Sequence, residues 1–263
     1  MRHASSRTVS RVVIAGALAD KADVGGHLWM VLQYVRALQR RGIDVCLVDR
    51  LNSVADPGRH LKNMATTLRS LGFAGTYVPL DVLDACPDCR TAVSDYLSGC
   101  DLLININGYL QDEELLSAAP LKVFLDIDPG WPQMWQELGL ADTLADHDAY
   151  VTVGANIGRP GCVIPTCGVE WIHTRPPVVL EEWPVASRSN GTFTSVASWR
   201  GAFGPIDYKG HTYGLRAHEF RKFMDLPRRT GAPFEVALHI HPNEGTDLAR
   251  LDGAGWRLVD PRE

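Results

Sequence analysis

The sequence has no long hydrophobic run and no excess of basic residues. A membrane-spanning helix needs about 18 consecutive apolar residues, and no stretch of the chain approaches that length. Lys and Arg number 26 against 31 Asp and Glu, so the formal net charge is −5, whereas general nucleic-acid binders normally present a basic stripe. We therefore expect no transmembrane segment and no nucleic-acid partner.

Cysteine is also scarce, with six residues in a chain of 263. That number is too low for a disulfide scaffold. The segments CPDC (86–89) and CVIPTC (162–167) could form a zinc site, but the second spacing is loose and nearby histidines follow no ligand pattern. In HIHPNEGTD (239–247) a capped loop suits the pattern better than a metal site. We predict free thiols, no metal and no bound cofactor.

The N-terminal segment has two interpretations. A basic start, an apolar run over 12–18 and a following "ALA" could mimic a secretory signal. The run barely reaches the minimum length of such a segment, and a helix-forming stretch follows it, which favours a buried first β-strand. With that interpretation the protein is expected in the cytoplasm.

What the chain does contain is a regular alternation of apolar runs and amphipathic stretches. Near-continuous apolar runs are typical of parallel strands that are buried on both faces. Helical stretches between such runs indicate an open, mostly parallel α/β sheet with helices on both faces, as in a Rossmann-like fold. The expected strands cover 11–18, 43–51, 76–82, 101–107, 121–129 and 149–156, and the expected helices cover 27–42, 59–72, 89–99, "DEELLSAA" and "WPQMWQELGL".

A second, shorter series of alternating elements follows a proline-rich stretch. Residues 158–192 hold little periodicity and suit an interdomain connection. Alternation then resumes as strand, helix, strand, helix and strand, which is half of a doubly wound domain whose exposed edge and faces need cover. We predict one domain over 1–180, a linker over 181–192 and a partial domain over 193–263. The elements expected in the second domain are strands over 193–199, 234–240 and 256–261, a helix over 216–231 and a short helix at "TDLARLDGAG".

The first candidate site is the loop ADVGGHLW, between the first strand and the first helix. Gly25 and Gly26 would let a ligand approach the backbone, and the start of a helix favours anions. The carboxyl end of a strand is also where α/β sheets place ligands. A plain tight turn explains the glycines equally well, and His27 is either a polar cleft residue or an ordinary first-turn residue. The spacing is not the G-x-G-x-x-G dinucleotide fingerprint.

The second candidate site is DIDPGWPQMW, at the end of an apolar strand. Asp126 and Asp128 are two residues apart, so both side chains can point to one side. Carboxylates beside the exposed indoles of Trp131 and Trp135 would suit a sugar, with hydrogen bonds to hydroxyls and an apolar surface for stacking. Alternatively, Asp128 caps a helix and the tryptophans belong to the core. His147, before the next strand, is a candidate catalytic base or a structural histidine.

The third candidate site is SWRGAFGPIDYKG. Arg200 stands at the carboxyl end of a predicted strand, and Lys209 and Gly210 close the loop that follows. A guanidinium and an ammonium beside a glycine-bearing loop would suit a diphosphate. The alternative is a solvated loop with two ordinary surface charges.

Two doubly wound units joined by a proline-rich linker resemble the GT-B glycosyltransferases, which transfer a sugar from a nucleotide-sugar. The segments DIDPGWPQMW, PTCGVEWIHTRPPVVLEEWP and SWRGAFGPIDYKG are also similar to a bacterial set of glycosyltransferases of undefined function. The resemblance implies that Arg200, Lys209 and Gly210 contact the donor diphosphate. It also implies that Gly25, Gly26 and His27 form the cleft loop on the acceptor side. The partners implied are a nucleotide-sugar and a small-molecule or glycan acceptor, with no metal or cofactor.

The resemblance also indicates what is missing. In the family, a later part of the donor domain supplies an acidic motif for the sugar and ribose, and this chain ends at WRLVDPRE before any such motif. We therefore expect a truncated donor domain, with self-association through that incomplete domain as one consequence. Two other interpretations stay open: a non-catalytic nucleotide- or sugar-binding partner subunit, and a nucleotide-sugar epimerase on the same fold.

Overall fold

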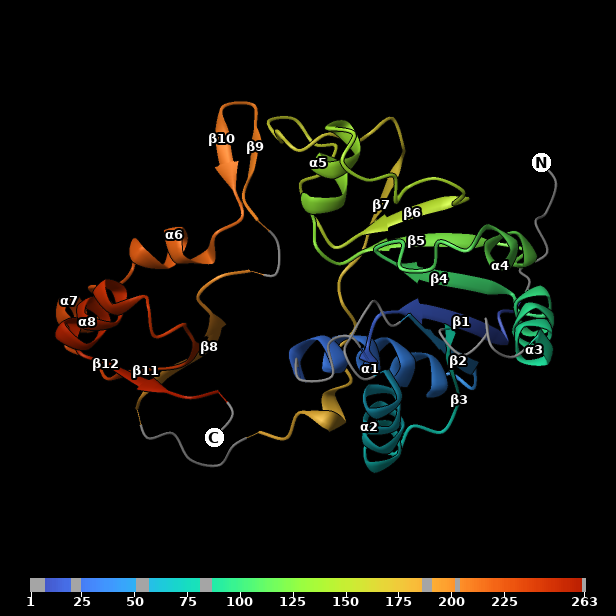
Figure 1. Cartoon of the computed structure of the whole chain (residues 1–263), viewed down its shortest axis with the longest axis horizontal. Helices are drawn as coiled ribbons and strands as arrows, with labels where there is room; N and C mark the ends of the chain where they lie inside the picture. Colours follow the sequence, from blue (N-terminus) through green and yellow to red (C-terminus); the bar gives the residue numbers. More distant parts are fainter. Residues whose placement is uncertain are drawn as a thin grey trace. The chain divides into compact units, whose positions relative to one another are not determined.

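The protein consists of two compact units, Met1–Trp183 and Pro184–Glu263, which are described separately. Figure 1 shows the computed structural model of the chain, which describes residues 8–19, 25–50, 57–80, 87–185, 191–201 and 204–261. The division falls inside the proline-rich stretch. No helix within these ranges is long and apolar enough to span a membrane.

The first unit is built on a seven-stranded parallel sheet. Its strand order is β3-β2-β1-β4-β5-β6-β7, and every neighbouring pair is parallel. The six strands expected from the sequence are present. Strand β7 was missed, because its three residues lie among prolines and carry no periodic signal. The strands are β1 (Arg11–Gly16), β2 (Asp44–Asp49), β3 (Thr76–Pro79), β4 (Leu102–Ile106), β5 (Lys122–Asp126), β6 (Ala149–Thr152) and β7 (Trp171–His173).

Helices cover both faces of this sheet, as the apolar strands require. Alternate residues of β1 point to opposite faces, so Val12 and Ile14 pack in one core cluster with α1 and α2, while Val13 and Ala15 pack in another with α3 and α4. This is the Rossmann-like arrangement in general kind. The helices are α1 (Gly25–Gln39), α2 (Pro57–Ser70), α3 (Pro87–Ser98), α4 (Glu113–Ala118) and α5 (Trp131–Glu137).

The stretch that leads out of the first unit is ordered against α1. The segment contains a short 3-10 helix (Leu180–Glu182), which the sequence did not predict. The Val179 backbone N–H donates to Gln33 Oε1 over 2.6 Å. Arg40 pairs with Glu181 at 2.5 Å, and the rings of Trp29 and Trp183 lie 6.0 Å apart. The end of the unit is thereby fixed to its first helix.

The second unit holds a three-stranded parallel sheet of order β12-β11-β8. A separate antiparallel hairpin, β9–β10, occupies the stretch that the sequence predicted to be a plain loop. The predicted helix over 216–231 is also wrong in detail: it is two helices, and Pro227, at the start of the second, lacks the N–H that would continue the first. The elements are β8 (Phe193–Ser198), β9 (Ile206–Tyr208), β10 (His211–Tyr213), α6 (Arg216–Arg221), α7 (Leu226–Thr230), β11 (Phe234–His239), α8 (Gly245–Ala254) and β12 (Trp256–Val259).

A buried charged group lies in the core of this unit. The Asp247 side chain is 6% exposed and accepts hydrogen bonds from Trp199 Nε1 at 3.0 Å and from Arg221 Nη2 at 2.5 Å. The bonds from Arg221 hold the pKa of Asp247 below its usual value. Trp199 itself is fully buried in the cluster that also contains Val236, Leu251 and Trp256. The ion pair therefore joins α6 and α8 across the covered face of the sheet.

Replacing Arg221 with Met is expected to lower the free energy of unfolding of the second unit by about 3 kcal/mol at pH 7, because it leaves a buried carboxylate unpaired. The pKa of Asp247 is lower in the folded chain than its value of 3.8 in the unfolded chain. Its ion pair therefore stabilises the fold at any pH above 3.8, and this stabilisation disappears as the pH falls through the folded pKa. The gap between wild type and variant should therefore narrow below about pH 4. Urea unfolding at pH 7 and pH 3 measures both effects, and Arg228→Met, which removes an exposed ion pair to Asp225, is the matched control.

Candidate functional site

The strand order of the first unit reverses between β1 and β4, whose neighbours β2 and β5 lie on opposite sides. Ligands of open α/β sheets bind at the carboxyl ends of the strands beside such a reversal. Two segments of the structure come together there: the start of α1, at Gly25, and the loop after β4, at 107–109. This edge is the first place to look for a site.

The loop after β4 has a conformation that only a particular sequence can adopt. Asn107 and Gly108 have φ values of 48° and 67°, in the left-handed region that Asn and Gly tolerate best. A Cβ atom at Gly108 would lie 2.7 Å from the carbonyl oxygen of Thr143. Packing therefore requires glycine at this position, and the tight loop aims the residues on either side of it.

The start of α1 meets this loop through an aromatic contact. The rings of His27 and Tyr109 lie 6.5 Å apart and are nearly perpendicular, at 86°. Gly25 and Gly26 are exposed first-turn residues with negative φ, and a Cβ at either would meet no atom within 4 Å. Neither backbone geometry nor packing requires glycine at these two positions. Both residues belong to the first turn of α1, so the alternative of a plain tight turn at Gly25 and Gly26 is wrong.

At the end of β5, Asp126 is fully buried and accepts three hydrogen bonds. Its carboxylate binds Gln133 Nε2 at 2.7 Å, Thr152 Oγ1 at 2.6 Å and the backbone N–H of Asp128 at 3.1 Å. Burial raises the pKa of Asp126, against the effect of these donors. Asp126 thus joins β5, β6 and α5 and fixes the loop that carries Asp128. Its role is to position this loop.

Asp128 itself is exposed at the carboxyl edge. Its Oδ2 accepts a hydrogen bond from Asn107 Nδ2 at 3.0 Å, and Asn107 Oδ1 accepts one from the Ile127 N–H, also at 3.0 Å. The alternative that Asp128 caps α5 is wrong, because Gly130 occupies the N-cap position. We call His27, Asn107, Tyr109 and Asp128 the switch-point cluster. Asn107 and Tyr109 were missed because an "NGY" after a strand resembles an ordinary turn.

Two further features belong to the elements at this edge of the sheet: the indoles of α5, which follows β5, and Arg50, which follows β2. The rings of Trp131 and Trp135 lie 5.6 Å apart and both side chains are half-buried, so they are not core residues. Arg50, after β2, donates from Nη1 to the Tyr109 carbonyl at 3.3 Å and to Gln111 Oε1 at 2.9 Å. Sequence patterns gave no signal for Arg50, since a single arginine after a strand is common. The edge therefore combines a carboxylate, a histidine, indoles and a guanidinium.

His147 lies elsewhere in the first unit. Its Nε2 is 3.0 Å from Asn105 Nδ2 and its Nδ1 is 3.3 Å from the Leu144 carbonyl. Burial lowers the pKa of His147 and so favours the neutral ring. In that ring Nδ1 donates to the Leu144 carbonyl, and Nε2 accepts from Asn105 Nδ2. The structure does not bring His147 to Asp128, which binds Asn107 instead. A catalytic role for His147 stays a prediction.

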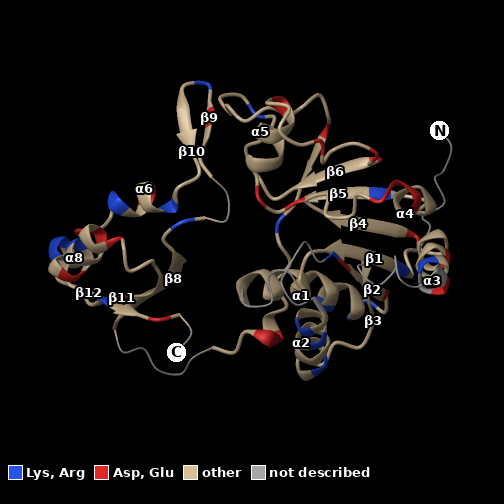
Figure 2. Cartoon of the chain, viewed as in Figure 1, with Lys and Arg blue, Asp and Glu red and all other residues tan. Residues whose placement is uncertain are grey.

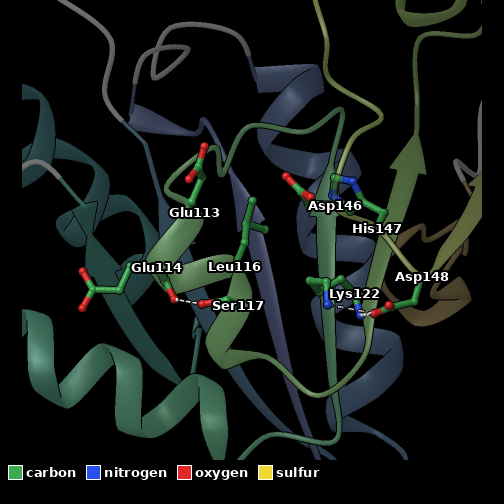
Figure 3. Close-up of a pocket in the computed structure, with 8 residues that line it drawn as sticks. All are labelled: Glu113, Glu114, Leu116, Ser117, Lys122, Asp146, His147 and Asp148. Carbon is green, nitrogen blue, oxygen red and sulfur yellow. Dashed lines mark hydrogen bonds and ion pairs between the residues drawn. The ribbon is translucent and has the colours of Figure 1, made fainter.

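His147 lines an open pocket of about 850 Å³, shown in Figure 3. Lys122 and Asp148, at the amino ends of β5 and β6, form an ion pair of 3.2 Å in its wall. This pocket is at the opposite end of β5 from Asp128. Its full lining consists of Glu113, Glu114, Leu116, Ser117, Lys122, Asp146, His147 and Asp148.

In the second unit, Arg200 stands at the carboxyl end of β8 as expected. Its Nε donates to Glu244 Oε1 at 2.5 Å, while 57% of its side chain remains exposed. A second guanidinium, that of Arg216, donates to Ser198 Oγ at 3.1 Å at the same strand end. The sequence did not single out Arg216, because it opens a helix that looked like an ordinary amphipathic one.

Lys209 and Gly210 form the tip of the β9–β10 hairpin. Their φ values are 49° and 77°, and Tyr208 pairs with His211 across them, as in a two-residue turn with both central residues left-handed. The Lys209 ammonium lies 5.0 Å from the centre of the Tyr208 ring. The loop that the sequence predicted here is therefore a hairpin, with Lys209 and Gly210 at its turn.

The histidines and carboxylates of 239–247 do not gather around one point. His241 Nδ1 accepts a hydrogen bond from the Asn243 N–H at 3.1 Å, while Glu244 and Asp247 pair with arginines. Across the ranges that the structure describes, no three His, Cys, Asp or Glu side chains are placed to hold a metal ion.

No protein-family model and no curated protein matches this sequence. What the fold defines is an α/β protein with a Rossmann-like seven-stranded parallel sheet and a second, smaller parallel unit.

Proposed function

We propose that the chain is a glycosyltransferase-like protein of the GT-B kind, which moves a sugar from a nucleotide-sugar to the hydroxyl of an acceptor. The observation that carries the proposal is Asp128, an exposed carboxylate held by Asn107 at the carboxyl edge of a parallel sheet, beside the strand-order reversal. Carboxylates next to aromatic rings are well suited to sugars, and Trp131 and Trp135 stand three and seven residues after Asp128.

The switch-point cluster supplies what sugar transfer needs on the acceptor side. The acceptor oxygen forms a bond to the anomeric carbon of the sugar, the bond from that carbon to the diphosphate breaks, and the acceptor proton passes to a base. Asp128 is the base in this proposal, and His27 orients the acceptor hydroxyl. The bare backbone at Gly25 and Gly26 lets the acceptor approach the start of α1. Arg50, which donates a hydrogen bond to the Tyr109 backbone carbonyl, adds a positive charge to this edge of the sheet.

In the second unit, Arg200 is the proposed contact of the donor diphosphate, with Lys209 and Gly210 as further contacts. A guanidinium binds phosphate through paired N–H donors, and it stabilises the charge that develops on the leaving diphosphate. The bond to Glu244 leaves more than half of the Arg200 side chain exposed, so phosphate can compete for it. Arg216 extends the positive charge at the same strand end.

Replacing Arg200 with Ala is expected to weaken binding of a nucleoside diphosphate at least tenfold, the loss typical of a charge-assisted hydrogen bond of about 1.5–3 kcal/mol. Isothermal titration calorimetry with uridine, guanosine and adenosine diphosphates measures it. The matched control is Arg228→Ala, on α7, whose guanidinium donates to the Gly253 carbonyl at the amino end of the sheet. Equal binding by wild type and Arg200→Ala would contradict the donor-site assignment.

A non-catalytic nucleotide-sugar-binding subunit is the second candidate, and the small size of the second sheet favours it. Incubation with nucleotide-sugars, with and without a panel of hydroxyl acceptors, separates the candidates. A glycosylated product supports transfer, and binding without any product supports the subunit. An epimerised nucleotide-sugar without acceptor would contradict both and indicate an epimerase.

A further inference from the structure

Arg50 differs from the other half-buried arginines in its hydrogen-bond partners. Five arginines within the described ranges are half-buried. Four of them pair with a carboxylate, as Arg11–Asp44, Arg36–Glu182, Arg90–Asp112 and Arg221–Asp247. Arg50 instead donates to two neutral oxygens, the Tyr109 carbonyl and Gln111 Oε1. Taking a charge out of water is costly unless an opposite charge replaces the lost hydration, so this guanidinium is suited to an anion from outside the chain.

The side chain of Arg50 lies at the strand-order reversal. Arg50 follows β2 directly, and its backbone N–H donates to the Gly16 carbonyl at the end of β1 over 2.9 Å. Its guanidinium reaches Tyr109, in the loop after β4. Since β2 and β4 flank β1 on opposite sides, the side chain of Arg50 spans the carboxyl end of β1. That is where open α/β sheets bind their ligands.

One edge of this guanidinium is left for a ligand. Both hydrogen bonds of the Arg50 side chain come from Nη1, at 3.3 Å to the Tyr109 carbonyl and at 2.9 Å to Gln111 Oε1. They hold the planar group in place, and no residue that the structure describes bonds to its Nε or Nη2. The N–H groups on Nε and Nη2 are parallel and can bind two oxygens of a phosphate or a carboxylate together. The unused edge therefore matches an oxyanion.

The surroundings of Arg50 also favour an anion. Asp49, the carboxylate next to it in the chain, is 1% exposed and accepts hydrogen bonds from two N–H groups after β1 and from the Tyr77 hydroxyl. The helices that begin at this end of β1 and β2 are α1 and α2, and neither contains Asp or Glu (Figure 2). The start of a helix carries a partial positive charge. An anion at this edge would therefore meet no acidic side chain from these two helices.

We propose that the acceptor carries a phosphate or carboxylate group, and that Nε and Nη2 of Arg50 bind this group at the strand-order reversal. One short loop serves both ends of such an acceptor. Its residue Asn107 holds the base Asp128, and its Tyr109 carbonyl holds Arg50. The anionic group binds at Arg50 and the hydroxyl at Asp128, so Arg50 selects charged acceptors over neutral ones. Because it identifies the ligand as the acceptor, this proposal rests on the proposed function.

The test measures binding of three sugars to the full chain by isothermal titration calorimetry: glucose, glucose 6-phosphate and glucuronate. At least one anionic sugar should bind about tenfold or more tightly than glucose, the margin of a charge-assisted hydrogen bond. Arg50→Gln should remove this preference. Arg50→Lys keeps the charge without the paired donors and should retain only part of it. A preference for the phosphate alone would identify a phosphomonoester as the ligand, and one for glucuronate alone a carboxylate.

Arg11→Gln is the matched control for the substitution of Arg50. Arg11 is also half-buried, but it lies at the amino end of β1 and pairs with Asp44, so its replacement should leave the preference unchanged. A preference that survives Arg50→Gln, or that is lost in Arg200→Ala instead, would overturn the proposal. Failure of both anionic sugars to bind at about 10 mM, a concentration above the millimolar dissociation constants of weak ligands, would overturn it as well.

Sugar transfer is measured separately, with the same three sugars as acceptors and a panel of nucleotide-sugars. Transfer to an anionic sugar that Arg50→Gln slows supports both proposals. Transfer to glucose alone would overturn the anionic acceptor and leave the proposed function standing. Binding that depends on Arg50, without any transfer, would support Arg50 as the anion site and contradict the proposed function.

Discussion

Replacing Asp126 with Ala is expected to lower the free energy of unfolding of the first unit by about 4 kcal/mol, because two buried donors and one partly buried donor lose their acceptor at about 1–3 kcal/mol each. The donors are Gln133 Nε2, Thr152 Oγ1 and the Asp128 N–H. Denaturation by urea, followed by circular dichroism, measures the change. Asp126→Asn should cost about half as much, since one amide oxygen cannot serve donors that now bind two carboxylate oxygens.

The difference in unfolding free energy between wild type and Asp126→Asn should depend on pH, in a direction that follows from the pKa shift of Asp126. Burial raises the pKa of Asp126 above 3.8, so the folded chain holds this proton more tightly than the unfolded chain. The resulting stability is complete below the unfolded pKa and is lost as the pH rises through the folded pKa. Relative to Asp126→Asn, which does not titrate, wild type should therefore be most stabilised in acid. If wild type instead gained stability over Asp126→Asn as the pH rose toward neutral, the pKa of Asp126 would not be raised in the folded chain.

Replacing Asp128 with Asn is expected to reduce sugar transfer by about 10²–10⁴-fold, the range for loss of a general base. The side chain is exposed and keeps one hydrogen-bond partner, so stability should change by less than about 0.5 kcal/mol. Affinity for a nucleoside diphosphate should stay as in wild type, since Arg200 belongs to the other unit. Initial rates of nucleotide release in the presence of the acceptor measure the effect.

Two further variants separate catalysis by Asp128 from general damage to the edge. Asp252→Asn, an exposed carboxylate on α8, should transfer sugar at the wild-type rate. Asn107→Ala removes the bond that orients Asp128 and should give a smaller loss than Asp128→Asn, because the base itself remains. If Asp128→Asn retained full activity, a base other than Asp128 would have to accept the proton.

Most of the first unit could be predicted from its sequence. Buried parallel strands such as β1 and β2 read as continuous apolar runs, and α1 shows helical spacing of its buried leucines and valines. Short elements among prolines and glycines carry no such period. That is why β7 and the β9–β10 hairpin were missed, and why one predicted helix proved to be two at Pro227.

The candidate site could be predicted only in part. Asp128 and the glycines before His27 stand at strand ends, which sequence patterns locate well. The partners of Asp128 and His27 come from the loop after β4, about 20 and about 80 residues away along the chain respectively. Only the strand order brings β4 between β1 and β5. Arg200 was placed correctly at its strand end, but its pairing with Glu244 depends on the fold of β11 and α8.

The two units have separate hydrophobic cores, one around Trp199 and Trp256 and the others under the seven-stranded sheet. Chains built in this way need not melt as a single cooperative system. Heating should therefore give two calorimetric transitions, with Asp126→Ala shifting one and Arg221→Met the other. A single melting temperature would then describe neither unit, and each substitution would report which half of the chain it had weakened.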